Sequence, residues 1–414
     1  MTVAGTLPGD ARKRYFRGTH RTVEPSRTLS VVAPFLGEMG ITRVANVTGL
    51  DRIGIPVYTV CRPNSRSISV CQGKGLDADA ARVSGVMEAV ETWHAENIAL
   101  PVRLGSRDEL QRELPLVDVD RLPKSVEELY RPDRPLPWVQ GQRWPDGAPL
   151  YVPLEIVSAD YTLPRLPGSG CFAASTNGLA SGNTLAEAVA HGLYEVIERD
   201  ASTLWSLSRP RARHECGVDP ATIDDDDCRA LLARFEQAGL EVRTWDVTSD
   251  VGIAVFLCLV FSREADASDP EFGCGAHPAR EIALARALTE AAQARTTFIA
   301  GSRDDFDPAL YGREARTRRR AYCLGEAARH RPLRAFADTP THNADSIESD
   351  LNHARERLAR AGMDTIVVVD LTRESPGIPV VRVIVPGLEG PRDHDGADYV
   401  PGERARAAVA DLPL

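Results

Sequence analysis

Two glutamates three residues apart, Glu195 and Glu198, are the first residues in this 414-residue chain whose types and spacing suggest chemistry. On a helix, this spacing puts both carboxylates on one face, where like charges repel. Either water screens the repulsion or a bound cation compensates it. Arg199 follows directly, and its planar guanidinium is suited to phosphate. The stretch therefore leaves open a solvated acidic face or a site for a cation and an anionic ligand.

The same pattern occurs three times in the sequence. Residues 84–91 (SGVMEAVE) align with 191–198 (HGLYEVIE) and, more loosely, with 286–293 (RALTEAAQ). A solvated face has no reason to keep a Glu-x-x-Glu/Gln register in every copy, so the repetition favours a shared site. Carboxylates from separate helices suit Mg2+, which prefers oxygen ligands, and Arg199 and Arg295 could contact phosphate. These residue types indicate an α/β protein that handles Mg-nucleotide or phosphate.

A strand-like run or a glycine-rich turn precedes each copy. Residues 67–71 predict a strand before the first helix, and Asp77 predicts its N-cap. Thr184 is the expected N-cap of the second helix, with Glu187 completing a capping box. Pro278 is expected at the first position of the third helix. Each unit should therefore fold as strand, glycine turn and helix, with the polar residues near the middle of the helix.

We expect these units to belong to one α/β (α+β) domain over residues 1–414, in which they surround a single site. The expected segments are repeat units at roughly 60–100, 170–205 and 255–300, a proline-rich connecting segment at 101–150, and further strands at 251–261, 365–371 and 380–385.

The charge balance narrows the class of partner. The chain has 59 acidic and 49 basic residues, a net charge of -10, which argues against general attraction to nucleic acids or anionic membranes. No apolar run approaches the ~20 residues that a membrane-spanning helix needs, and no apolar signal region begins the chain. We therefore expect a cytoplasmic protein with no nucleic-acid or membrane partner. The 8 cysteines form no CxxC pair, so neither a zinc site nor a disulfide scaffold is predicted.

Lys74, one of few lysines in an arginine-rich chain, lies between Gly73 and Gly75. Because glycine lets a backbone approach a ligand, Lys74 is a candidate phosphate contact; the alternative is a chance position. The sequence contains no GxxxxGK[ST] loop and no kinase-like motif set. It also offers no cysteine or serine in a convincing nucleophile–base arrangement, so the catalytic residues stay unassigned.

Several motifs together resemble the YcaO family. They span nearly the whole chain in order: Arg21 in GTHRTVEPSRTL, VTGLDRIGIPV (47–57), SRSISVCQGKGL (65–76), SGVMEAVE (84–91), STNGLASGNT (175–184), EVIERDA (195–201), EAAQAR (290–295) and IPVVRVIVPGLEG (378–390). The resemblance implies a YcaO-type fold and an enzyme that activates a peptide backbone amide with ATP. A nucleophile adds to the amide carbon, the former carbonyl oxygen is phosphorylated, and ADP and phosphate are released.

The resemblance also implies cofactors and site residues. ATP and Mg2+ are the expected cofactors, and the expected metal ligands are Glu88, Glu91, Glu195 and Glu198. The expected ATP-binding residues are Ser84, Lys74, Ser175, Asn177, Arg199, Gln293, Arg295 and Arg21. The matching helices would then be the walls of one site, and the metal would compensate the paired carboxylates.

The motifs leave product and partners open. The expected substrate is a ribosomally made, post-translationally modified precursor peptide, and the expected reaction is cyclodehydration to a thiazoline or other azoline, or formation of an amidine. Thioamidation with a TfuA-type sulfur-delivery protein is one alternative, and a non-catalytic peptide-binding scaffold is another. An unrelated Mg-nucleotide ligase would instead release AMP.

The ends of the chain are similar to those of stand-alone and TfuA-associated bacterial members. The sequence ends in DLPL without a PxPxP tail, and little chain precedes the first motif. We therefore expect a separate leader-binding or TfuA-type partner, or recognition of the peptide unaided, and leave a homodimer open.

Overall fold

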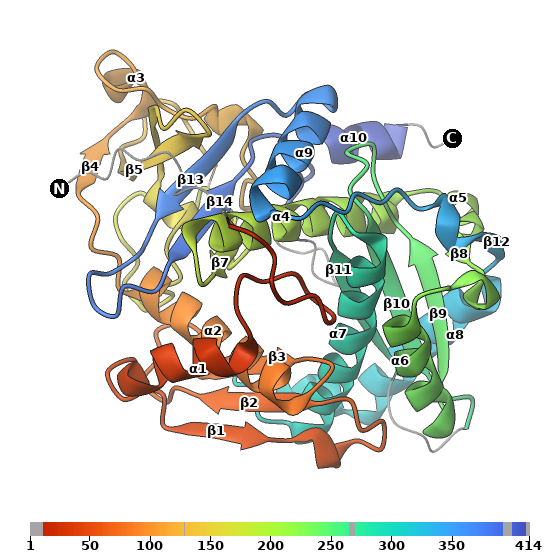
Figure 1. The fold of residues 1–414 in the computed structure, drawn as a ribbon. Coiled ribbons are helices and arrows are strands. Elements are labelled where there is room, and N and C mark those ends of the chain that lie inside the picture. Colours follow the sequence, from red (N-terminus) through yellow and green to blue (C-terminus); the bar gives the residue numbers. More distant parts are fainter. Residues whose placement is uncertain (1–10, 128, 265–269, 392–399, 411–414) are drawn as a thin grey trace. The chain divides into compact units, whose positions relative to one another are not determined.

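The three predicted repeat units each form a short strand followed by a long helix (Figure 1). The pairs are β3 (Val70–Lys74) with α2 (Ala78–Glu96), β7 (Leu179–Ser181) with α4 (Leu185–Leu207), and β11 (Glu271–Ala276) with α7 (Arg280–Ala300). This computed structural model describes residues 11–127, 129–264, 270–391 and 400–410. Its mixture of helices and sheets confirms the predicted α/β class.

The contacts between Cα atoms divide the chain into two units. Unit 1 contains residues 1–13, 90–207 and 344–414, and unit 2 contains residues 14–89 and 208–343. Neither unit is continuous in sequence, and the division falls within α2. The interpretation of the whole chain as one catalytic domain stays a prediction.

Unit 1 is built on a six-stranded sheet with the order β4-β5-β13-β14-β7, in which β6 also pairs with β5. Helix α4 packs on β7 and β14, and it also contacts α9 and α10. The bounds are β4 (Val102–Gly105), α3 (Arg107–Leu110), β5 (Leu136–Trp144), β6 (Pro149–Pro153), α9 (Ile347–Arg360), β13 (Ile366–Asp370), β14 (Val380–Ile384) and α10 (Glu403–Ala410).

Unit 2 contains a three-stranded sheet, β1-β2-β3, and a five-stranded sheet, β11-β10-β9-β8-β12. Helix α7 packs on β10 and β11 and also contacts β3. The remaining bounds are α1 (Pro25–Val32), β1 (Arg43–Asn46), β2 (Val57–Cys61), α5 (Pro210–Glu215), β8 (Gly217–Val218), α6 (Asp226–Gln237), β9 (Glu241–Asp246), β10 (Val255–Phe261), α8 (Arg313–Arg329) and β12 (Pro332–Arg334).

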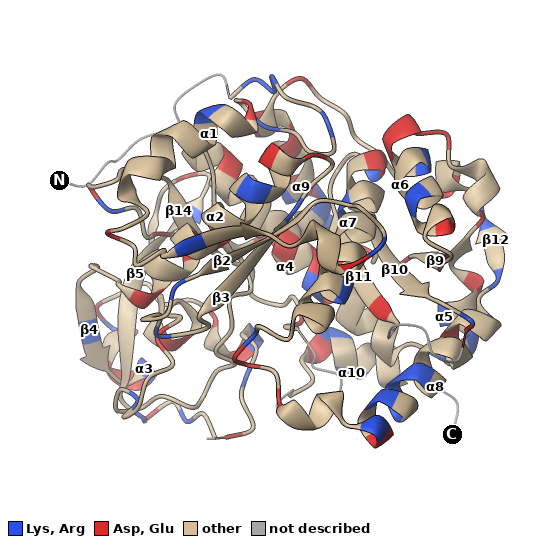
Figure 2. Cartoon of the chain, turned by 90° about the horizontal axis from the view of Figure 1, so that it is seen from below, with Lys and Arg blue, Asp and Glu red and all other residues tan. Residues whose placement is uncertain are grey.

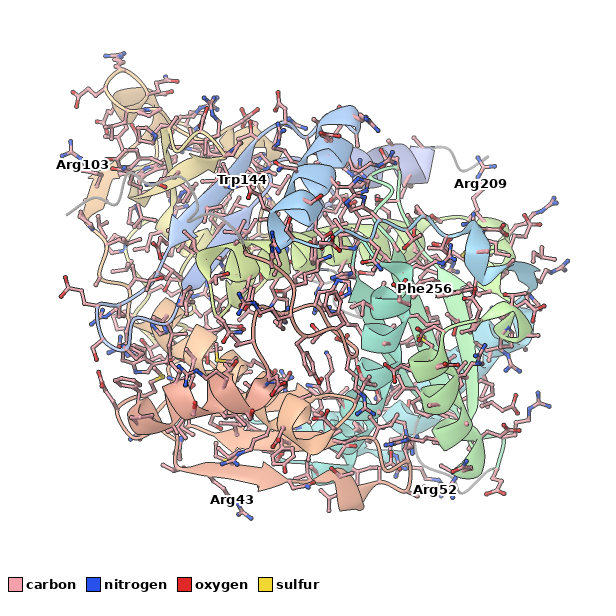
Figure 3. The ribbon with its side chains drawn as sticks, in the orientation of Figure 1. Arg43, Arg52, Arg103, Trp144, Arg209 and Phe256 are labelled. Atoms are coloured by element: carbon pink, nitrogen blue, oxygen red, sulfur yellow. The ribbon has the colours of Figure 1, made fainter. Side chains whose placement is uncertain are left out.

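The core of unit 2 lies between its five-stranded sheet and helices α6 and α7. Phe256 on β10 is fully buried there and stacks on Phe336 with 5.7 Å between ring centroids. Arg43 and Arg52 are exposed and point away from this core (Figure 3). Basic residues gather along α8 (Figure 2), and Arg316 and Arg318 of this helix are exposed.

The helix starts follow the expected local chemistry, with two differences. The Asp77 carboxylate accepts the N–H of Ala80 at 2.8 Å, which confirms this N-cap. The Thr184 hydroxyl accepts the N–H of Glu187 at 3.2 Å. The Glu187 carboxylate accepts the N–H of Asn183 at 2.7 Å instead of that of Thr184, so the predicted capping box is shifted by one residue. The prediction for Pro278 was wrong, because α7 begins two residues later, at Arg280.

Two predicted strands begin later than expected because local turns precede them. Ser65 accepts the N–H of Ser67 at 3.2 Å and donates to the carbonyl of Ile68 at 2.7 Å, so β3 begins only at Val70. A turn closed by the N–H of Gly252 and the carbonyl of Ser249, at 2.9 Å, likewise delays β10.

The segment 101–150 does more than connect the first two repeat units. Its β4 and β5 are hydrogen-bonded strands of the six-stranded sheet, and Trp138 and Val139 of β5 are fully buried. Proline in this segment obscured the strand pattern.

No described helix is both long and apolar enough to cross a membrane. The C-terminal residues 411–414 lie outside the described residues.

Candidate functional site

All three repeat strands lie at the edge of their sheets, as far as the described residues show: β3, β7 and β11 each stand at one end of the strand order. An edge strand leaves N–H groups without a strand partner. In unit 2, the N–H of Gln72 on β3 donates to Glu88 at 3.1 Å, and the N–H of Cys274 on β11 donates to Glu290 at 3.2 Å. Each of these two bonds joins residues that are 16 positions apart in the sequence, so these two copies of the repeat have a common geometry.

Lys74 lies in this part of unit 2. Its ammonium is 2.5 Å from the carboxylate of Glu290, and both side chains are about three-quarters buried, with 23% and 25% exposed. Gln293, one turn further along α7, donates to the carbonyl of Gln72 at 3.4 Å. Two predicted ATP-binding residues therefore lie at β3: Lys74 is its last residue, and Gln293 contacts its Gln72. The same strand donates a hydrogen bond to Glu88.

Burial raises the pKa of Glu88 above that of an ordinary carboxyl group. The N–H of Gln72 and the positive charges of Arg303 and Lys74 act in the opposite direction, while Glu290 adds to the increase. A partly buried carboxylate near a second carboxylate gains from a nearby cation. Ser84 lies one turn before Glu88 on α2 and is also partly buried, so it occupies the same helix face.

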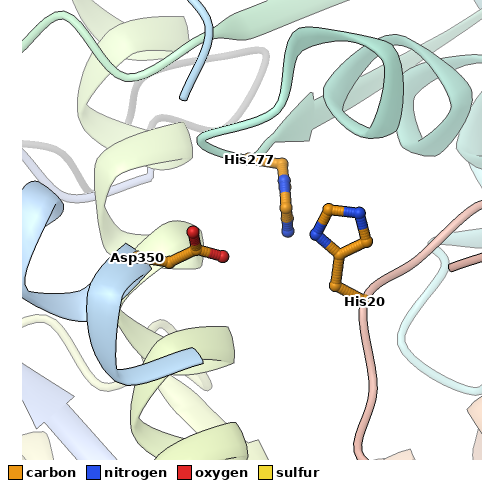
Figure 4. Close-up of side chains that lie close together, drawn as sticks. All are labelled: His20, His277 and Asp350. Carbon is orange, nitrogen blue, oxygen red and sulfur yellow. The ribbon is translucent and has the colours of Figure 1, made fainter. Parts of the chain in front are cut away.

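Arg295 and Arg21 occupy different surroundings within unit 2. Arg295 is buried, and its Nε and Nη2 contact the carboxylate of Asp51 at 2.9 and 3.2 Å. This bidentate pair fixes the guanidinium. Arg21 follows His20, whose ring meets that of His277 edge to face, with 4.9 Å between centroids (Figure 4). His277 in turn accepts the N–H of Ala279, the N-cap of α7, at 2.9 Å.

The remaining predicted carboxylates belong to unit 1. Glu91, at the C-terminal part of α2, accepts both the N–H and the hydroxyl of Ser181 on β7, at 2.9 and 2.6 Å. Glu198 on α4 is buried, with 4% exposed, whereas Glu195 and Arg199 are partly buried. An i, i+3 spacing puts Glu195 and Glu198 on one helix face, as predicted.

The predicted turn with Ser175 and Asn177 is held from β14. Arg382 is buried, with 1% exposed, and donates to the carbonyl oxygens of Asn177, at 2.9 Å, and Ser175. Burial lowers the pKa of Arg382 to about 10, and the nearby Tyr161 and Glu195 act in the opposite direction. The guanidinium therefore stays charged at neutral pH.

Sequence reasoning did not assign five residues whose contacts with predicted site residues are described above. They are Gln72, Glu290, Asp51, Ser181 and Arg382. The repeat register could have identified Glu290, because it aligns with Glu88 and Glu195. Nothing in the sequence pairs Asp51 with Arg295 or Arg382 with the turn before β7, because those contacts join distant segments.

The donor set fits a hard divalent cation. The predicted ligands in both units are carboxylates, the kind of ligand that Mg2+ prefers, and Glu198 is buried in unit 1. A carboxylate oxygen pair has several lone pairs, so a bond from one N–H leaves acceptor capacity for a metal. The chemistry of the residues is therefore compatible with Mg2+.

Comparisons with known proteins address fold and cofactors. A family model described as YcaO cyclodehydratase, ATP- and Mg2+-binding, matches residues 72–389. A Rhizobium leguminosarum bv. trifolii protein, described as an uncharacterized protein in the tfuA 3' region, is 39% identical over 400 residues, which cover 93% of each chain. The family model confirms the prediction of ATP and Mg2+ as cofactors.

Two solved structures are similar over nearly the whole chain. YcaO from Methanopyrus kandleri bound with AMPPCP and Mg2+ has a TM-score of 0.75 at 25% identity, over 95% of this chain and 99% of that chain. A heterocyclase in complex with substrate and cofactor has a TM-score of 0.77 at 21% identity, over 99% of this chain and 58% of that chain. The second likeness supports the fold alone.

Proposed function

Since the chain belongs to the YcaO family, we propose that it is an ATP- and Mg2+-dependent enzyme that activates a backbone amide of a precursor peptide by phosphorylating its oxygen. The match of residues 72–389 to an ATP- and Mg2+-binding family carries this proposal. That range contains every proposed ligand except Arg21. An amide oxygen is a poor leaving group, and transfer of a phosphoryl group from ATP converts it into one that departs as phosphate. The nucleotide product is ADP.

The proposed metal ligands are Glu88, Glu91, Glu195 and Glu198. When bound, Mg2+ neutralises charge on the nucleotide phosphates. The chain's own contribution is to hold these carboxylates on rigid helices. Glu88 and Glu91 are further oriented by N–H groups of the edge strands β3 and β7.

The proposed nucleotide-binding residues differ in how they are held. In unit 2, Lys74 is oriented by Glu290 and Arg295 by Asp51, and both pairs keep a positive side chain in place before any ligand binds. In unit 1, Arg199 follows Glu198 on α4. The full proposed set is Arg21, Lys74, Ser84, Ser175, Asn177, Arg199, Gln293 and Arg295. Most of the catalytic effect would come from positioning and charge neutralisation.

The proposed product is an azoline or an amidine, formed when a nucleophile adds to the activated amide. Backbone thioamidation is the second candidate. It is favoured by the Rhizobium relative, whose description places it in the tfuA 3' region, and it would require a TfuA-type partner that delivers sulfur. A cytoplasmic location and a separate leader-binding partner belong to the same proposal.

Calorimetry of Mg-ATP binding tests the proposal, with wild type compared with Glu198→Gln. We expect binding that requires Mg2+ and is lost or strongly weakened in the variant, because the neutral amide cannot replace a carboxylate ligand. The free variant should remain folded by circular dichroism, since glutamine keeps the shape of the side chain. ATP turnover should be abolished in the variant.

Glu326→Gln is a matched control. Glu326 lies on a helix and is as buried as Glu198, with 2% exposed, but side chains of the protein already contact it: His214 at 3.4 Å, Arg329 at 3.6 Å and Arg213 at 3.8 Å. Its replacement should lower stability and leave Mg-ATP binding intact. Normal ATP turnover by Glu198→Gln would remove Glu198 from the metal site. A folded wild type that binds no Mg-ATP would favour the scaffold alternative.

A further inference from the structure

The middle of β14 carries an arginine that is directed at a turn and not at solvent. Arg382 is 1% exposed. Its Nη1 donates to the carbonyl of Asn177 at 2.9 Å, and its Nη2 donates to the carbonyl of Ser175. One guanidinium therefore donates to two carbonyl oxygens of the same turn. A lysine ammonium would bind this pair of oxygens less well because it lacks the planar fork of donors.

The next residue on β14 holds the same turn from its backbone. The N–H of Val383 donates to the carbonyl of Gly178 at 2.8 Å. Gly178 has a φ of 78°, and a Cβ atom there would lie 2.2 Å from the carbonyl oxygen of Val383. A positive φ and this close approach both require glycine. The turn at 175–178 is therefore fastened to β14 by three hydrogen bonds and has little room to rearrange.

The turn leads directly into β7, which pairs with β14 in antiparallel register, Leu179 opposite Arg382. Ser181 at the end of β7 donates to Glu91, one of the proposed metal ligands. Arg382 also attracts Glu195, another proposed metal ligand in the same unit. Its charge thus acts on both the turn and the carboxylate of Glu195.

We propose that Arg382 is a positioning residue for nucleotide binding, which holds the turn 175–178 in the form in which Ser175 and Asn177 meet the nucleotide. The inference rests on the proposed function, because it assumes that these two residues serve ATP. Arg382 itself need not touch the ligand. Its two bonds go to main-chain carbonyls, so it fixes the backbone that presents the side chains.

Hydrogen exchange of the free protein tests the positioning role directly. Arg382→Gln keeps some hydrogen-bonding capacity but removes the charge and the fork. We expect the amides of Asn177, Leu179 and Ser181 to exchange about tenfold faster or more, as loss of a charged hydrogen bond implies. Amides of α9, far along the chain in the same unit, should exchange as in wild type.

Mg-ATP calorimetry on the same variants supplies the second measurement. Arg382→Gln should weaken binding about tenfold or more, and Arg382→Lys, which keeps the charge, should restore part of the affinity. An arginine that only stabilised the fold would not produce partial recovery of Mg-ATP affinity in Arg382→Lys together with faster hydrogen exchange confined to the turn. Should Arg382→Gln fail to fold, Arg382→Lys carries both measurements, with a smaller expected effect.

Arg373→Gln is the matched control in unit 1. Arg373 also donates to a main-chain carbonyl, that of Asn97 at 2.7 Å, and lies over the ring of Trp93 at 5.7 Å. This variant should change neither exchange at the turn nor Mg-ATP affinity.

Unchanged exchange at 177–181 in folded Arg382 variants would overturn the positioning role, and so would unchanged Mg-ATP affinity. A wild type that binds no Mg-ATP would contradict the proposed function and with it the nucleotide part of this inference. The exchange result would then still report whether Arg382 holds the turn, so the two failures can be told apart.

Discussion

At the scale of single residues, three glutamates of the repeat hold main-chain N–H groups and thereby serve the fold. Glu88 accepts an N–H from β3, Glu290 accepts one from β11, and Glu91 accepts one from β7. Buried N–H groups must find an acceptor, and a carboxylate provides one. The same bond orients the carboxylate. These hydrogen bonds explain why a solvated acidic face, the simpler interpretation of the sequence, does not describe these three side chains.

His330 gives a residue-scale prediction for pH. Burial lowers its pKa below the usual value for histidine, and the nearby Arg243 and His214 lower it further, while the carbonyl of Thr244 acts in the opposite direction. Nε2 lies 2.9 Å from that carbonyl, and the ring meets Trp245 edge to face. The unfolded state therefore binds a proton at higher pH than the folded state.

The direction in which stability changes with pH follows from this difference in pKa between the folded and unfolded states. Stability contributed by neutral His330 is present above the unfolded pKa, near 6.5, and is lost as pH falls below it. Wild type should melt at a lower temperature at about pH 5.5 than at about pH 7.5, and His330→Gln should show a smaller decrease. Thermal denaturation followed by circular dichroism measures both. An equal decrease in the two proteins would show that His330 does not contribute.

At the scale of elements, glycine allows two of the three repeat strands, β3 and β11, to lie against their helices. A Cβ atom at Gly73 on β3 would lie 2.1 Å from both the carbonyl oxygen of Ala81 and the nitrogen of Gly85 on α2. A Cβ atom at Gly273 on β11 would lie 2.2 Å from the nitrogen of Ala291 on α7. The glycines beside Lys74, which we interpreted as allowing a backbone to approach a ligand, thus allow β3 to approach α2.

Gly73→Ala should therefore destabilise the protein by about 1–3 kcal/mol or more, the usual effect of overpacking. Backbone atoms, not flexible side chains, surround the new methyl group, so the strand must move away from the helix. Urea denaturation measures the loss. Gly49→Ala is the control, because its Cβ would meet nothing within 4 Å and should change stability by less than about 0.5 kcal/mol. Equal stability of the two variants would contradict the contact.

Local sequence chemistry predicted the elements better than their pairing. The repeat, the three long helices and the N-cap at Asp77 follow from residues close together in the chain. The partner of β7 does not, because β14 lies about two hundred residues later and its pattern is simply apolar. Strand β5 was missed because prolines surround it, although its Trp138 is fully buried.

At the scale of the whole molecule, sequence order gives no guide to the two units. Unit 2 combines residues 14–89 with 208–343, and the chain enters unit 1 within α2, a helix that reads as one continuous pattern. The family resemblance extends over nearly the whole chain, and its motifs lie in both units. The sequence therefore proposed a set of site residues, but it could not predict the contacts that orient them, such as Asp51 to Arg295.

The proposed ligands can be tested in each unit by the response of the whole chain to Mg-ATP. Binding to the folded state alone stabilises it, by about 2.7 kcal/mol at a hundredfold excess over the dissociation constant. Hydrogen exchange should therefore slow in α4 of unit 1, around Glu195 and Glu198, and in α7 of unit 2, around Gln293. Residues 313–334 of unit 2 carry no proposed ligand and should change least.

The pattern of protection decides which assignments stand. Slower exchange in α4 without any change in α7 would remove Gln293 and Arg295 from the nucleotide-binding set, and the reverse would remove the carboxylates of α4. ATP with a metal chelator should protect less than Mg-ATP, because the carboxylates lose the cation that links them to the phosphates. Equal protection with and without Mg2+ would remove the four proposed metal ligands, and Glu88 and Glu91 would then serve only the edge strands that they contact.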